Sequence, residues 1–156
     1  MRLGPRVRPT RDGRYEVRLP DAERQLLGSL ASQMRAALDE GEPEDPGLRR
    51  LFPSAYPEDP ARDAEYRGLV RDDLLGRRRA ALDTLEATLG ATRLDDDELA
   101  AWMGAINDLR LVLGTRLDVS EETDLSPRPD DPSAPALAVY GYLGVLLESI
   151  VTALGR

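Results

Sequence analysis

Arginines lie inside apolar helical stripes, and they are the residues whose spacing could do chemistry. If residues 60–89 form a helix, Arg78 lies near the centre of its apolar stripe, and Arg71 lies one heptad earlier. In a second helix over residues 94–117, Arg110 falls in the middle of the stripe. An arginine keeps its charge at neutral pH, so an inward arginine needs a carboxylate or several carbonyl oxygens. The pattern therefore predicts buried ion pairs or a site for a small anion.

Glu148 is the carboxylate that we expect to meet these arginines, since it lies on a strip of small residues within the apolar segment 134–154. One interpretation pairs it with Arg78 or Arg110 between helices. A second lays the arginine stems over the core and leaves their charged heads in water. A third adds the nearby Asn107 and predicts a ligand-binding domain that holds a small carboxylate or phosphate. The sequence leaves all three open.

The chain lacks several side chains on which catalysis usually depends. It has no cysteine and no histidine, and all 21 of its basic residues are arginine. Disulfides, thiolate chemistry, the commonest general base and zinc ligand, and lysine Schiff bases are therefore excluded. The acidic run from Asp95 to Glu98 fits the first turn of a helix better than a metal site. We expect a protein that is not an enzyme, with no catalytic or metal-binding residues and no cofactor.

Charge is distributed unevenly along the chain. The net charge is −8, but residues 1–19 hold six arginines against Asp12 and Glu16. The candidate partner surface consists of Arg6, Arg8, Arg11, Arg14 and Trp102. Trp102 would be an anchor if it is exposed, and otherwise it fills the core. The acidic balance suits a basic partner surface better than DNA, while the basic arm could contact an acidic protein surface or nucleic acid. Direct DNA contact is the less favoured of these routes.

Periodicity and turn residues predict a mostly α fold, a single helical domain over residues 1–156. It is a bundle of four main helices with a short N-terminal β-hairpin. The helices are expected from Pro20 to Gly41, from Asp59 to Leu89, over 94–117 and over 134–154. Residues 1–19 form the basic arm and hairpin, with a tight primed turn at Asp12-Gly13. Residues 42–59 and 118–133 are acidic, proline-rich connections.

The segment Leu137 to Leu154 is about long enough to cross a bilayer. Glu148 within it favours a core helix instead, and no signal peptide is visible, so we expect a cytoplasmic protein without a membrane contact. The segment has more apolar circumference than a small bundle covers. Homodimerisation through this helix is therefore a further prediction.

Four segments together resemble the AosR-type oxidative-stress regulator family of actinobacteria. They are LRRLFPSAYPEDP, EYRGLVRDDLLGRRRAALDTLEATL, LDDDELAAWMGAINDLRLVLGTRLDV and PALAVYGYLGVLLESIV. The resemblance extends over residues 5–155, and its most specific part is Asn107 to Val119. It implies a helical cytoplasmic regulator, and some members are linked to redox-responsive transcription through a closely spaced cysteine pair and contact with the transcription machinery. This chain has no cysteine, so a thiol switch is excluded and no family site residue can be transferred.

Overall fold

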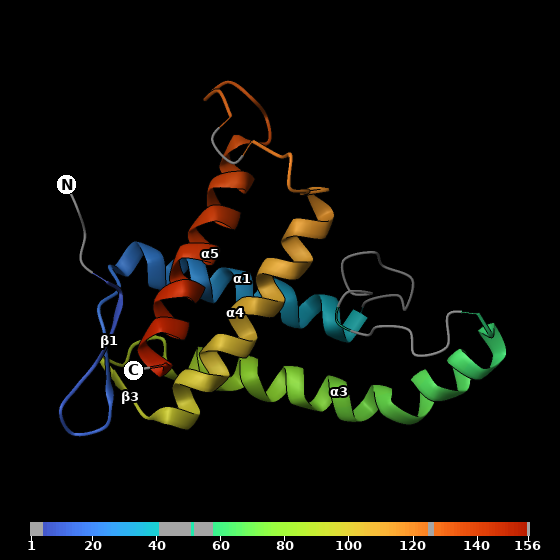
Figure 1. The fold of residues 1–156 in the computed structure, drawn as a ribbon, viewed down its shortest axis with the longest axis horizontal. Coiled ribbons are helices and arrows are strands. Elements are labelled where there is room, and N and C mark those ends of the chain that lie inside the picture. Colours follow the sequence, from blue (N-terminus) through green and yellow to red (C-terminus); the bar gives the residue numbers. More distant parts are fainter. Residues whose placement is uncertain (1–4, 41–50, 52–57, 125–126, 156) are drawn as a thin grey trace.

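The computed structural model describes residues 5–40, 51, 58–124 and 127–155. Two short strands, β1 and β2, precede helix α1; helix α3, strand β3 and helices α4 and α5 follow (Figure 1). Their bounds are β1 Val7–Pro9, β2 Tyr15–Val17, α1 Asp21–Glu40, α3 Pro60–Thr88, β3 Arg93–Leu94, α4 Asp96–Arg116 and α5 Ala134–Leu154. The mostly α prediction is confirmed, and each of the four predicted helices lies within two residues of its expected position.

Capping side chains set where two of the helices begin. The Asp59 carboxylate accepts a hydrogen bond from the Arg62 amide at 3.2 Å, and Pro60 occupies the first turn of α3. At α4, Asp95 accepts from the Glu98 amide at 2.8 Å and Glu98 accepts from the Asp95 amide at 2.9 Å. This reciprocal capping box accounts for the acidic run that precedes α4.

The predicted hairpin is present, but it belongs to a three-stranded antiparallel sheet of order β1-β2-β3. Val7 pairs with Val17, and Tyr15 pairs with both Pro9 and Leu94. The predicted primed turn is wrong. A primed turn of type I′ needs positive φ at both central residues, whereas only Gly13 has it here, at 82°. The Thr10 amide donates to the Arg14 carbonyl at 2.8 Å, so the loop has three residues and ends on Gly13.

Helix α4 packs against both α3 and α5 and is the central helix of the bundle (Figure 1). Its buried residues face more than one neighbour; they are Leu99, Trp102, Ala105, Ile106, Asp108, Leu109 and Val112. The sheet covers one end of this core, with Val7, Tyr15 and Val17 buried. Strand β1 lies along α5, and the Val7 amide donates to Ser149 Oγ at 3.2 Å. The hairpin is therefore part of the folded body.

An arginine of α1 joins three parts of the fold at the same end. Arg24 donates from Nε to the carbonyl of Leu19 at 3.0 Å and from Nη1 to the carbonyl of Ala91 at 3.1 Å. The same Nη1 also donates to the Leu89 carbonyl. The last carbonyl groups of a helix have no backbone partner, and a cation beside them is stabilising. Arg24 therefore holds the end of α3 against α1 and the sheet.

Candidate functional site

Arg78 turns inward from α3, as predicted, but its partner is a carboxylate that sequence analysis did not single out. Its Nη1 lies 2.7 Å from Oδ1 of Asp108 on α4, and Asp108 is buried. Nη2 also donates to the Leu51 carbonyl at 3.5 Å. The predicted pairing with Glu148 is wrong, because α4 is the helix packed on α3 and Glu148 is exposed on α5.

The ionisation of Asp108 is set by two opposing effects. Burial raises the pKa of its carboxyl, the charge and hydrogen bond of Arg78 lower it, and the result is a pKa of about 6. The Arg78–Asp108 ion pair therefore forms fully only above that pH. This geometry joins α3 to α4, and the carboxylate is occupied by the protein's own arginine.

Arg110 packs towards α5 without meeting Glu148, so that predicted pairing is also wrong. The guanidinium carbon lies 4.6 Å from the centroid of the Tyr140 ring, an arrangement typical of a cation–π contact. A β-carbon built on Gly144 would come within 3.3 Å of Arg110 Nε, so the glycine makes room for the arginine. Within the described part of the chain, that buried Nε has no hydrogen-bond partner.

A small cavity of about 150 Å³ lies beside Arg110, at the C-terminal end of α4. Asp118 and Thr115 line it together with the Tyr140 ring. The negative end of the helix dipole and a nearby carboxylate both oppose an anion there. The surroundings of Arg110 thus favour its own positive charge over a bound carboxylate or phosphate.

Of the five residues predicted to form one charged site, the four whose side chains the structure describes do not converge. Arg78 faces Asp108, whereas Arg110 contacts Tyr140 and approaches Gly144. Positions 108 and 110 point about 200° apart on an α-helix, so the two arginines serve different faces of α4. Asn107 is half-buried and Glu148 is exposed. Arg71 lies in α3, but its side chain falls outside the described part of the structure.

Trp102 is not a surface anchor, so its place in the predicted partner surface is wrong. The side chain is fully buried, and its indole Nε1 donates to Thr88 Oγ1 at 2.7 Å. It fills the core between α3 and α4, which was the alternative drawn from the sequence.

Arg6 is likewise engaged within the protein. Its Nε and Nη2 each lie 2.9 Å from an oxygen of Glu23 on α1 in a bidentate pair, and both side chains are 18% exposed. Burial raises the pKa of Glu23, but the hydrogen bonds and charge of Arg6, with the Tyr142 hydroxyl nearby, outweigh it and lower the pKa overall. Arg6 therefore anchors β1 to α1, and a partner would not find it free.

The other three arginines of the predicted surface are exposed, and we refer to Arg8, Arg11 and Arg14 as the hairpin arginines. No salt bridge joins them to a carboxylate in the described part of the chain. The strands beneath them are well held: the Tyr15 hydroxyl donates to Asp96 Oδ1 at 2.6 Å. The structure thus presents cationic side chains on an anchored hairpin.

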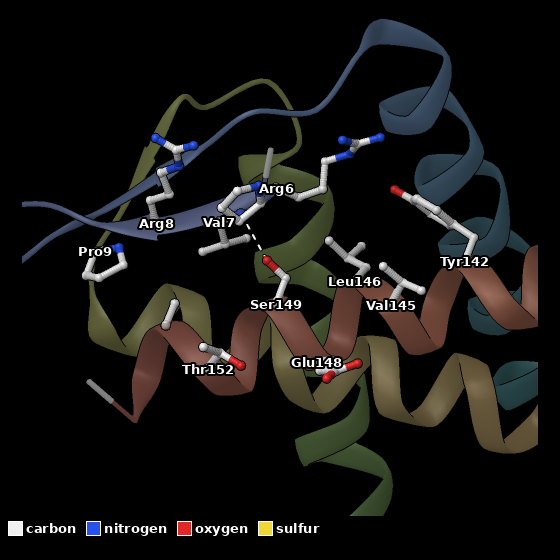
Figure 2. Close-up of a pocket in the computed structure, with 12 residues that line it drawn as sticks. Arg6, Val7, Arg8, Pro9, Tyr142, Val145, Leu146, Glu148, Ser149 and Thr152 are labelled. Atoms are coloured by element: carbon white, nitrogen blue, oxygen red, sulfur yellow. Dashed lines mark hydrogen bonds between the residues drawn. The ribbon is translucent and has the colours of Figure 1, made fainter. Parts of the chain in front are cut away.

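An open groove of about 740 Å³ runs between β1 and α5 (Figure 2). Residues of both elements line it, and we call it the β1–α5 groove; they are Pro5–Pro9, Tyr142, Val145, Leu146, Glu148, Ser149, Thr152 and Ala153. Val145 is 65% exposed, although it is a large apolar residue. This surface was predictable in part, because residues 134–154 have more apolar circumference than a small bundle would cover.

Helix α5 is buried on one side and open on another. Its inner residues are Leu137, Leu143, Leu146, Ile150 and Ala153, while Val145 and Val151 are exposed. The length and composition of α5 would allow it to cross a membrane, but the core helices of soluble proteins share these two properties.

In the part of the chain that the structure describes, no cluster of three or more acidic, histidine or cysteine side chains could hold a metal ion.

Fold and surface define a small helical protein whose inward charges serve packing and whose open features are a basic hairpin and an apolar groove. Residues 4–154 match the family described as "Domain of unknown function (DUF2017)", and the chain belongs to that family. The predicted family resemblance is thereby confirmed.

Curated relatives of this chain carry a functional name. The chain is 30% identical over 184 residues to "Oxidative stress regulator AosR" of Mycobacterium tuberculosis, covering 93% of this chain and 84% of the relative. The "Putative oxidative stress regulator AosR" of Mycobacterium leprae is 36% identical over 129 residues, covering 72% of this chain and 59% of the relative. These names support a regulatory role. No solved structure matches the chain.

Proposed function

We propose that this chain is a non-enzymatic regulatory protein of the cytoplasm that acts through protein–protein contacts in the oxidative-stress response. The name of its relatives supports the stress response, and family resemblance supports components of the transcription machinery as partners. The chain has no cysteine, so its activity does not depend on a thiol switch of its own.

The observation that carries this proposal is the exposure of the hairpin arginines on an anchored sheet. Arg8, Arg11 and Arg14 project from a molecule of net charge −8, so this small surface opposes the overall charge. Opposite charges across an interface speed association and select the partner. The contact that fits is an acidic protein surface that pairs with these guanidinium groups.

DNA is the less suitable partner for the same arginines. A protein that binds DNA must neutralise several phosphates at once, and the net negative charge of this chain opposes that approach. Arginines at one hairpin tip provide few phosphate contacts. An acidic protein surface presents fewer charges and can match the geometry of two or three guanidinium groups.

A rescue experiment in the native host tests the proposal. A strain lacking the gene receives the wild-type chain or the variant Arg11→Glu/Arg14→Glu, and transcripts are measured after peroxide treatment. We expect the wild-type chain to restore the transcript response. The variant should lose most of it while its thermal midpoint stays unchanged, because both side chains are exposed.

Arg77→Glu/Arg128→Glu is the matched control, with the same charge change at exposed positions elsewhere. It should restore the response as the wild-type chain does. Full rescue by the hairpin variant would contradict a role for these arginines. An unchanged transcript profile in the deleted strain would contradict the regulatory role itself.

A further inference from the structure

The β1–α5 groove has the chemistry of a contact surface that is not yet covered. Its centre is apolar, with Val7 and Leu146 at the floor and Val145 at one end (Figure 2). Val145 leaves apolar surface open to solvent beside the charged side chains that line the same groove. The same helix also carries the exposed Ala138 and the half-buried Gly141, small residues that permit close approach of another helix.

An extended peptide cannot occupy the groove by adding a strand to β1. Arg6 and Thr10 use their backbone groups towards β2, through the Arg18 amide at 2.8 Å and the Arg14 carbonyl at 2.8 Å. In an antiparallel pair the intervening residues, Val7 and Pro9, point their backbone groups outward. The Val7 amide is already bonded to Ser149, and Pro9 has no amide hydrogen. The outer edge of β1 therefore offers no backbone donor to a new strand.

The two rims of the groove carry opposite charges. Arg8 projects from β1 on the side away from α5, and Glu148 lies on the side of α5 away from β1 (Figure 2). Both side chains are exposed, and no salt bridge within the described residues engages either of them. A surface with a cation on one rim and an anion on the other is complementary to itself under a two-fold rotation.

We propose that the occupant of the β1–α5 groove is a second copy of this chain, in a two-fold dimer where Arg8 of each copy pairs with Glu148 of the other. Figure 2 shows Arg8 and Glu148 on opposite sides of the groove, with Ser149 between them. A two-fold rotation about an axis that passes through the groove exchanges the two rims. Apolar and charged contacts are thus satisfied together.

Sedimentation of the purified full chain over a concentration series tests the dimer directly. We expect the wild-type chain to dimerise at about 100 µM or below, as an interface with an apolar centre requires. Val145→Arg should weaken the dimer by about tenfold or more, because a charge would be buried in the groove. Val151→Arg is the control, since Val151 is also exposed on α5 but does not line the groove.

Charge reversal on the two rims tests the pairing itself. Arg8→Glu and Glu148→Arg should each be mostly monomeric, because each places like charges opposite one another in the dimer. Mixing the two variants should restore a dimer, since every contact in the mixed species joins a carboxylate to an arginine. Circular dichroism of each variant alone confirms that it is folded before mixing.

Three results would overturn the inference: a wild-type chain that stays monomeric at about 1 mM, a Val145→Arg chain that dimerises as the wild type does, or folded rim variants that do not associate when mixed. The inference goes beyond the proposed function and its test is separate. In the dimer Arg8 is engaged, which leaves Arg11 and Arg14 for an acidic partner. The rescue experiment changes these two residues, which do not line the groove, so either idea can fail without the other.

Discussion

At the scale of single residues, the Arg78–Asp108 pair shows how burial and pairing compete. Asp108 binds its proton more tightly in the folded chain, where its pKa is about 6, than in the unfolded chain, where it is near 3.8. A carboxyl whose pKa is raised by folding makes the protein less stable as pH rises between those two values. Arg78 limits this loss because it stabilises the carboxylate above pH 6.

Replacing Arg78 therefore has an effect that depends on pH. We expect Arg78→Met to reduce the free energy of unfolding by about 3 kcal/mol at pH 7.5, because a buried carboxylate loses its partner. The loss should be smaller at pH 5, where Asp108 of the wild-type chain is largely protonated. Urea unfolding at both values measures it, with Arg77→Met, at a 75% exposed side chain, as the control. An equal loss at both values would contradict the account of this pair.

The inward arginine is predictable from the sequence, but its partner is not, for an identifiable reason. Helical periodicity over residues 94–117 places Met103, Ile106 and Leu113 on one apolar stripe, whereas α4 is buried on a second face as well. Asp108 lies on that second face, between Ala105 and Val112 at helical spacing. The spacing was the available signal: Asp108 follows Ala105 by three positions and precedes Val112 by four, so all three share one face of the helix. The sequence favours Glu148 instead, because it does not show which helices pack against each other.

At the scale of elements, the crossing of α4 and α5 depends on glycines that face the partner helix. A β-carbon on Gly114 would lie 2.9 Å from Cε2 of Tyr140, whose ring makes the cation–π contact with Arg110. A β-carbon on Gly104 of the same helix meets no atom within 4 Å. The two glycines thus differ in packing while sharing the same helix.

Alanine at these two glycines should have opposite effects on stability. Gly104→Ala should raise the free energy of unfolding by about 0.5 to 1 kcal/mol, because alanine loses less conformational freedom in a helix. Gly114→Ala should lower it by about 1 kcal/mol, because the Tyr140 ring must move from its place under Arg110. Thermal and urea unfolding of both variants measures the difference. A stabilising Gly114→Ala would show that the ring moves without cost.

The helices were predictable because capping and first-turn residues at their ends can be recognised from the local sequence. Asp59 and Pro60 mark the start of α3, and the run Asp95 to Glu98 marks the start of α4. The third strand was not predictable in this way, since Arg93–Leu94 is too short to show alternation. The hairpin turn was assigned to the wrong type because Asp-Gly suits both a two-residue loop and a three-residue loop that ends on glycine.

At the scale of the whole molecule, charge is separated between an acidic body and a basic hairpin that belongs to the core. Val7, Tyr15 and Val17 are buried, so deleting the N-terminal residues would remove core contacts together with the arginines. Charge substitution at exposed positions leaves those contacts in place. It is therefore the informative way to test what the surface binds.

Site-specific photocrosslinking in the native host tests the central claim most directly. A photoreactive amino acid replaces Arg14 in one strain and the exposed Arg128 in another, and adducts are identified after illumination under peroxide stress. We expect a protein adduct at position 14 whose crosslinked segment is rich in aspartate and glutamate, and which disappears when Arg11→Glu is added. Equal labelling at both positions, or adducts with nucleic acid alone at position 14, would contradict the claim that the hairpin arginines bind an acidic protein surface.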